Sequence, residues 1–176
     1  MDTADLLGTA GTDRPELRAP RLERVTGPTL RPFSTADLES CVAVWLRALE
    51  ARDGAAAPDG TAARVEARLA LPSQWSVVVE QAAAVVGFAT VLPDGDAALL
   101  QYLAVHPAHA GRGLGRRLLT AAVEHASGLE LRLDVRIGNG RAIALYEASG
   151  FARTGAPVPH PLGGEPMARY VRPSRS

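Results

Sequence analysis

The sequence contains no lysine: each of its 19 basic residues is an arginine. The acidic residues also number 19, so the formal net charge at pH 7 is zero. A neutral chain has no overall field that would attract nucleic acid or a membrane surface. Aromatic residues make up only 5% of the chain and do not alternate with arginines, as they do in many RNA-binding segments. We therefore expect no nucleic-acid or membrane partner, and the chain cannot modify a lysine of its own.

Cysteine and long apolar runs are also scarce. Cys41 is the only cysteine, which excludes an intrachain disulfide and fits a reducing compartment. Two aspartates lie within the first five residues, where a signal peptide would be basic. The longest apolar region, residues 75–92, is interrupted by Glu80 and Gln81, which argues against a membrane span. These absences favour a cytoplasmic protein.

The order of predicted elements indicates one α/β domain. Residues 1–28 show no sustained hydrophobic period and are expected to form a disordered tail, which leaves residues 29–176 as the domain. Hydrophobic patterning and turn residues predict both kinds of element in the domain. Strands are expected near residues 29–33, 75–80, 84–92, 97–105, 129–135, 151–155 and 167–171, and helices near residues 34–51, 61–71, 114–126 and 139–150.

The connections between these elements predict the sheet. The unit from "LLQYLAV" through a helix to "LRLDV" is expected to form a right-handed parallel crossover. The shorter connections favour antiparallel neighbours. We therefore expect a mixed, mostly antiparallel sheet with helices on both faces, whose central parallel pair is joined by the helix that follows a glycine-rich loop.

That loop, "AGRGLGRR", places glycines at three alternate positions, Gly111, Gly113 and Gly115, with Arg112 and Arg116 beside them. Glycine permits a positive φ and a close approach of ligand to backbone. The first N–H groups of a helix lack internal partners and lie at its positive end, so this junction suits an anion such as phosphate. A tight turn without a ligand is the alternative. The spacing is not that of a dinucleotide fingerprint, and the absence of lysine excludes a P-loop.

Two segments in sequence, "LAVHPAHAGRGLGRRLL" and "LDVRIGNGRAIALYEASGF", resemble the GNAT superfamily of acetyl-CoA-dependent N-acetyltransferases. The resemblance covers about residues 28–172 and is tightest from Tyr102 to Phe151. It implies the GNAT fold, acetyl-CoA as co-substrate, and direct attack by an amine in a ternary complex.

The resemblance also implies which residues bind the cofactor. The strand before the glycines would pair with the pantetheine arm, the loop amides would bind the pyrophosphate, and an asparagine would contact the cofactor. These residues are Leu103, Ala104 and Val105 for the arm, Gly111, Arg112, Gly113, Leu114, Gly115 and Arg116 for the pyrophosphate, and Asn139. The family usually has Arg or Gln before the first glycine, where this chain has Ala110. One side-chain contact is therefore missing, and Arg112 or Arg116 would compensate or affinity would be lower.

Two further residues are candidates for the chemistry. Tyr146 matches the family's tyrosine next to the thioester sulfur and would protonate the departing thiolate; ordinary helix packing is its alternative. Asp134 precedes Tyr146 by twelve positions, as a glutamate does in GNAT enzymes that acetylate protein N-termini. It is the candidate base, with Glu80 and Glu66 as rivals. A surface salt bridge of Asp134 with Arg132 or Arg136 is the alternative.

The remaining candidates favour plain packing. His106 and His109 flank Pro107, but no cysteine or carboxylate completes a ligand set, so no metal is expected. Cys41 lies on the apolar face of a predicted helix and is expected in the core. Trp45 and Trp75 are each expected in the core or in the wall of a pocket.

We therefore predict an N-acetyltransferase that acts on a primary amine. An α-amine has a lower pKa than a lysine-type amine and is easier to deprotonate, which favours a small molecule or a protein N-terminus as acceptor. A monomer or homodimer is expected. The alternative is a non-catalytic coenzyme A-binding sensor or scaffold module.

Overall fold

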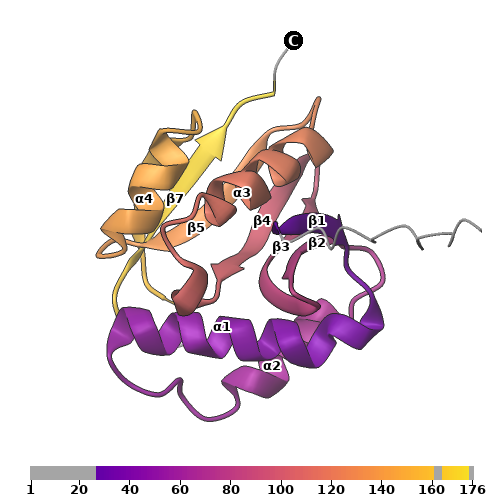
Figure 1. Ribbon diagram of the computed structural model, residues 1–176. Helices are drawn as coiled ribbons and strands as arrows, with labels where there is room; N and C mark the ends of the chain where they lie inside the picture. Colours follow the sequence, from indigo (N-terminus) through magenta and orange to yellow (C-terminus); the bar gives the residue numbers. More distant parts are fainter. Residues whose placement is uncertain (1–26, 161–163, 175–176) are drawn as a thin grey trace, which may run out of the picture.

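The computed structural model describes residues 27–160 and 164–174 of the chain (Figure 1). The helices are α1 (Leu38–Asp53), α2 (Thr61–Leu69), α3 (Leu114–His125) and α4 (Gly140–Glu147), with short 3-10 turns η1 (Thr35–Asp37) and η2 (Pro107–His109). The strands are β1 (Thr29–Pro32), β2 (Trp75–Gln81), β3 (Ala84–Asp94), β4 (Ala97–Val105), β5 (Leu131–Arg136), β6 (Ala152–Val158) and β7 (Met167–Arg172). Most of the tail predicted at residues 1–28 lies outside the described residues, and that boundary stays a prediction.

The strands form one seven-stranded sheet in the order β1-β2-β3-β4-β5-β7-β6. β4 and β5 pair in parallel, and every other neighbouring pair is antiparallel. The predicted mixed sheet with a central parallel pair joined by α3 is confirmed. The last two strands do not follow sequence order, because β7 inserts between β5 and β6.

Helices cover both faces of the sheet, as expected (Figure 1). α1 and α2 lie together along one side of the molecule and pack on Val78, Phe88 and Tyr102. α3 and α4 pack on the other face with Leu131, Leu133 and Val135 of β5. Cys41 of α1 is fully buried, so its predicted place in the core is confirmed.

A bulge in β4 positions the site. Thr90 pairs with Tyr102 and Val91 with Leu100, which leaves Gln101 as the extra residue on β4. Leu100 consequently packs in the α3 cluster, whereas Tyr102 packs under α1, although both are even-numbered. A bulge bends the strand that carries it, and β4 leaves β5 close to this point.

The turn between β2 and β3 carries no glycine. Ala82 and Ala83 both have positive φ, 50° and 63°, a conformation that alanine adopts at some cost. The sequence has no ordinary turn residues between the two predicted strands.

Candidate functional site

A gap opens between β4 and β5. Their parallel pairing joins Ala98 to Leu131 and Leu99 to Arg132 only, so the rest of β4, from Leu100 to Val105, has no strand partner on its β5 side among the described residues. His106 donates its N–H to the Val86 carbonyl of β3 at 2.8 Å. Because backbone groups alternate along an antiparallel strand, the N–H and C=O of Leu103 and Val105 point away from β3 and into the gap.

The gap adjoins a bare helix terminus. Gly113 is the N-cap of α3, in the left-handed region at φ 77°, and no side chain in the described ranges caps this end. Gly111 also has a positive φ, 79°, and nothing lies within 4 Å of the place where a Cβ would stand on either glycine. Open space and unpaired amides at the positive end of a helix fit a phosphate group. The loop is therefore compatible with the predicted phosphate site, which stays a prediction.

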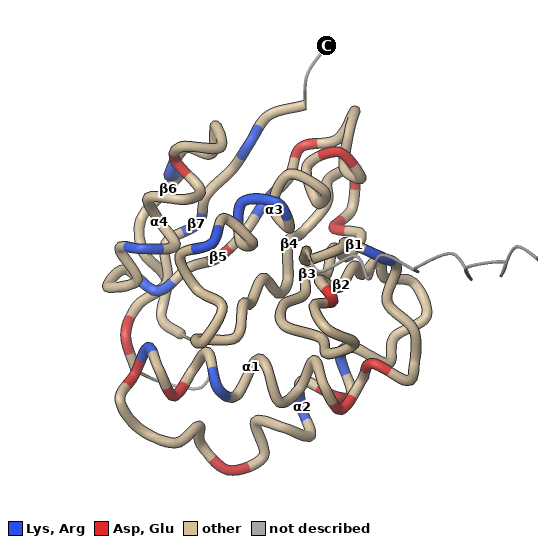
Figure 2. Tube along the Cα trace, viewed as in Figure 1, with Lys and Arg blue, Asp and Glu red and all other residues tan. Residues whose placement is uncertain are grey.

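The arginines of the loop differ in their availability. Arg112 and Arg116 are exposed, whereas Arg117 donates to the Pro28 carbonyl at 2.8 Å. Leu114 is 2% exposed and packs in the core, so it can contribute only its amide. Figure 2 shows basic residues along the connection from β4 and the first turns of α3.

Asn139 and Tyr146 come from the segment after β5. Asn139 caps α4, and its Oδ1 accepts the Ala142 N–H at 3.3 Å. Its side-chain NH2 group has no partner within residues 27–160 and 164–174. Tyr146 is 8% exposed and its ring lies 5.9 Å from that of Phe151. Its hydroxyl makes no hydrogen bond to another described residue, and burial raises the pKa of this hydroxyl to about 12.

Asp134 lies on the opposite face of β5 from Tyr146. Leu133 and Val135 are buried in the α3 and α4 cluster together with Tyr146, and side chains alternate along a strand, so Asp134 points to the other side. The two candidates thus flank the gap from its two faces.

The partner expected for Asp134 in a salt bridge was wrong. Arg169 of β7 donates Nε to Asp134 Oδ1 at 2.9 Å and Nη2 to Oδ2 at 2.8 Å. Arg132 is instead bound to Glu130 and Asp94. Arg136 instead pairs with an aspartate at the end of α1. Sequence reasoning missed Arg169, since it becomes a neighbour of Asp134 only when β7 pairs with β5.

The rival bases lie elsewhere. Glu80 accepts from Arg31 Nε at 2.7 Å at the β1–β2 edge, and Glu66 is exposed on α2.

His106 and His109 contact each other edge to face at 6.0 Å between ring centroids. Within residues 27–160 and 164–174, no three His, Cys, Asp or Glu side chains are grouped as metal ligands.

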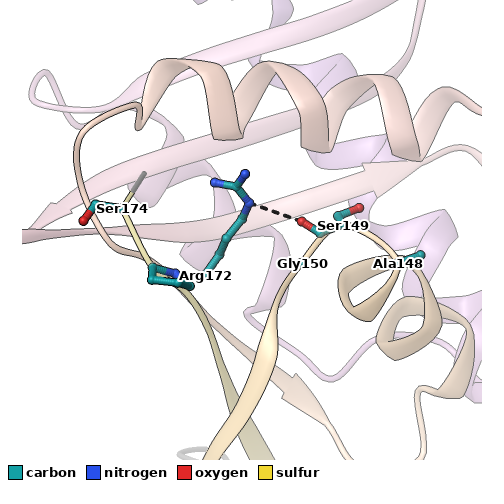
Figure 3. Close-up of a pocket in the computed structure, with 6 residues that line it drawn as sticks. Ala148, Ser149, Gly150, Arg172 and Ser174 are labelled. Atoms are coloured by element: carbon teal, nitrogen blue, oxygen red, sulfur yellow. Dashed lines mark hydrogen bonds between the residues drawn. The ribbon is translucent and has the colours of Figure 1, made fainter. Parts of the chain in front are cut away.

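Two cavities lie outside the gap. One, of about 490 Å³, is at the end of α4, where Arg172 Nε donates to the Ser149 carbonyl at 3.2 Å (Figure 3). The other, of about 530 Å³, lies between α1 and the β2–β3 turn. Neither is lined by the glycine loop, Asn139, Asp134 or Tyr146.

None of the helices in the described ranges has the length and apolar character that crossing a bilayer requires.

Comparison with known proteins agrees with this geometry. The N-alpha-acetyltransferase RimI of Mycobacterium tuberculosis is 37% identical over 91 residues, which is 49% of this chain and 58% of that protein. The chain thus spans little more than half the length of this relative. The ribosomal-protein-S18-alanine N-acetyltransferase of Escherichia coli superposes with a TM-score of 0.69 at 26% identity, covering 85% of this chain and 96% of that one.

A further structure shares the fold. The yncA protein of Salmonella typhimurium, solved with its cofactor acetyl-CoA, has a TM-score of 0.66 at 24% identity, covering 85% of this chain and 95% of that one. The sequence profile of the acetyltransferase (GNAT) family matches residues 43–151, which is more than half of the chain and runs from within α1 to Phe151. The chain therefore belongs to the acetyltransferase (GNAT) family.

Proposed function

We propose that the chain transfers the acetyl group of acetyl-CoA to a primary amine by direct attack in a ternary complex. The observation that carries the proposal is the bare amino terminus of α3 beside the gap between β4 and β5. The gap exposes backbone donors of Leu103 and Val105, and the loop at Gly111 and Gly113 leaves room for a pyrophosphate. The neighbouring fold that was solved with acetyl-CoA supports the same co-substrate.

The residues around the gap divide the binding work. The amides of Gly113, Leu114, Gly115 and Arg116 would hold the pyrophosphate, with Arg112 supplying further positive charge. The Asn139 amide group would donate to the cofactor arm. The main chain from Leu103 to Val105 would pair with the arm as an added strand does, and an amide near Val105 would polarise the acetyl carbonyl.

The transfer step needs two proton movements. A C–N bond forms to the acetyl carbon and the C–S bond breaks. Tyr146 donates a hydrogen bond to the departing sulfur, because a pKa of about 12 keeps the phenol protonated at neutral pH. The thiolate then takes its proton from the phenol or from solvent as coenzyme A leaves. The proton lost by the amine goes to Asp134, or to water held by it. An N-terminal α-amine is the acceptor type favoured by the two N-terminal acetyltransferases among the relatives.

A coenzyme A release assay over a panel of amines, with product masses measured, tests this proposal. We expect acetylated product from at least one α-amine. Since the chain has no lysine, an acetylated ε-amine in the mixture always comes from the acceptor. Tight acetyl-CoA binding without transfer to any amine would instead indicate the coenzyme A-binding sensor or scaffold.

A further inference from the structure

The ion pair between Asp134 and Arg169 has features that a merely structural pair does not need. Both carboxylate oxygens are engaged by two guanidinium nitrogens at 2.8 and 2.9 Å. The two residues are also directly opposite in the β5–β7 register. Within the described residues neither has a second salt bridge, although Asp94 adds a weaker Coulombic attraction to Arg169.

This unit is open to solvent at the gap. The Arg169 side chain is 48% exposed and that of Asp134 30%. The other face of β5 and β7 is sealed by α3 and α4 through Leu133, Ala168 and Tyr170, whereas α1 and α2 pack over Phe88 and Tyr102 nearer the middle of the sheet. A molecule approaching the gap from the side opposite Tyr146 therefore meets this pair.

The pair conflicts with simple base catalysis. The bidentate guanidinium takes one lone pair on each Asp134 oxygen and offsets its negative charge, so the paired carboxylate is a weaker base for an incoming amine. Arg169 keeps its charge under all ordinary conditions, since Asp134 raises the pKa of the guanidinium further. Asp134 attracts and deprotonates an amine more strongly when another anion occupies Arg169.

We propose that Arg169 selects the acceptor: the preferred amine carries a carboxylate close to its ammonium group and exchanges partners with the pair. Its carboxylate takes the Arg169 fork, its ammonium contacts Asp134, and two opposite-charge contacts replace one. This inference rests on the acetyl transfer proposed above and names the acceptor class as a zwitterionic amine, either an amino acid or a peptide with an acidic second residue.

Charge balance explains the selectivity. Exposed ion pairs add little to stability, so opening this one is easy when both ends find new partners. An acceptor with an amine alone would leave Arg169 unpaired beside it, and a second cationic group would be repelled by the guanidinium. A fork of two parallel N–H donors also matches a carboxylate better than a neutral carbonyl.

The test uses full-length protein and three amidated peptides that differ only in residue two: Ala-Glu, Ala-Gln and Ala-Lys, each extended by two glycines, with free alanine as the amino acid probe. We expect kcat/KM for the Ala-Glu peptide to exceed that for Ala-Gln by about tenfold or more, and Ala-Lys to be the poorest. Activity on free alanine and on the Ala-Glu peptide distinguishes the two acceptor sources.

Variants separate selection from folding. Arg169→Glu is expected to invert the order of the peptides, Arg169→Gln to level it, and Arg169→Lys to keep its direction with a smaller ratio. Arg153→Glu is the matched control, because Arg153 is exposed on β6 and pairs with Tyr170. The Tyr170 side chain packs in the α3 and α4 cluster, so both residues face the side of the sheet opposite Arg169. Arg153→Glu should leave the order unchanged. Circular dichroism confirms that each variant is folded.

Calorimetric titration of the same peptides into protein saturated with coenzyme A provides a readout that does not depend on turnover. A charge-ordered binding series without any acetylation would uphold the acceptor site and overturn the proposed activity. Acetylation with equal rates on all three peptides, or an equal loss on all of them in Arg169→Glu, would overturn the selection by Arg169 and leave the activity standing. Neither binding nor turnover with any probe would overturn both.

Discussion

Tyr146 shows how burial prepares a single residue for the reaction. A phenol with a pKa near 12 retains its proton at rest, while a thiol of about 8.5 is a weaker base once it has left as thiolate. Full proton transfer from Tyr146 is therefore uphill, and its main contribution is a hydrogen bond that strengthens as charge develops on sulfur.

Replacing Tyr146 with Phe should lower kcat by about 100-fold, since acid assistance contributes on that scale. The KM for acetyl-CoA should change little, because the ring still packs on Phe151. Steady-state kinetics with varied acetyl-CoA measures both. Tyr102→Phe is the matched control, as Tyr102 is a similarly buried tyrosine under α1. Unchanged turnover in Tyr146→Phe would leave this residue with a packing role.

Asp134 should reveal itself in the pH profile. An α-amine has a pKa of about 7.7–8.0, so below roughly that pH the acceptor arrives protonated and needs a base. Asp134→Asn is expected to depress kcat/KM most below about pH 8 and less above it. A pH–rate profile of both proteins on one acceptor provides the measurement. An equal loss at every pH would indicate positioning, and no loss would return Glu80 and Glu66 as candidates.

The sequence predicted which residues are candidates for the site, but it did not predict which residues they contact. The resemblance to the GNAT family identified Asp134 and Tyr146 as candidates, and in the structure they lie on opposite faces of β5. The partner of Asp134 was not readable. Arg132 and Arg136 are neighbours on the same strand, but each has a nearer acidic group, while Arg169 is 35 positions away and arrives only through the insertion of β7.

At the scale of the elements, the glycine loop and α3 were predictable because their signals are local. Gly113 ends the loop and caps the helix, and α3 runs from Leu114 to within a residue of the predicted end. The bulge at Gln101 was not predictable. β4 is apolar on both faces, so the alternation that would reveal a change of side is absent from "AALLQYLAV".

Gly113→Glu tests the loop. The new side chain places negative charge where the pyrophosphate is expected, so coenzyme A affinity should fall by at least about tenfold, or about 1.4 kcal/mol. Gly128→Glu is a close control: it lies just beyond the other end of α3, with φ of 87° and nothing within 4 Å of its Cβ position. Both variants carry the same backbone strain, and calorimetry should show weakened binding only for Gly113. Equal affinity in the two variants would contradict the phosphate assignment.

At the scale of the whole molecule, the gap between β4 and β5 can be reached from either face of the sheet. α3 and α4 cover one face of β5 and β7, the side proposed for the cofactor, and the Asp134–Arg169 pair lies on the other face, the side proposed for the acceptor. The bend of β4 opens the gap between them. Part of the stability of the folded protein comes from the far edge of the sheet, where β1, η1 and β2 meet.

Asp37 is the centre of that edge. It is 6% exposed and accepts from Arg31 Nη1 at 2.7 Å and Nη2 at 2.8 Å, and from the Ser34 N–H at 2.8 Å. The hydrogen bond from Arg31 is the main reason that the pKa of Asp37 falls to about 2. A depressed folded-state pKa stabilises the protein above the unfolded value of about 3.9, and this stabilisation is lost as the pH falls toward 2.

The charged form of Asp37 should contribute roughly 2 kcal/mol to the free energy of unfolding at pH 7. Asp37→Asn removes the charge at every pH. The difference in free energy of unfolding between wild type and variant should therefore be largest at neutral pH and shrink between about pH 4 and pH 2. What remains at low pH should be a constant difference due to altered packing. Urea unfolding at pH 7, 4 and 2.5 measures it. Asp59→Asn, at an exposed aspartate before α2, should show no such trend. A difference for Asp37→Asn that stays the same from pH 7 to pH 2.5 would mean that Asp37 stabilises the edge through packing and neutral hydrogen bonds alone, and that the ion pair with Arg31 adds nothing to the stability of the whole molecule.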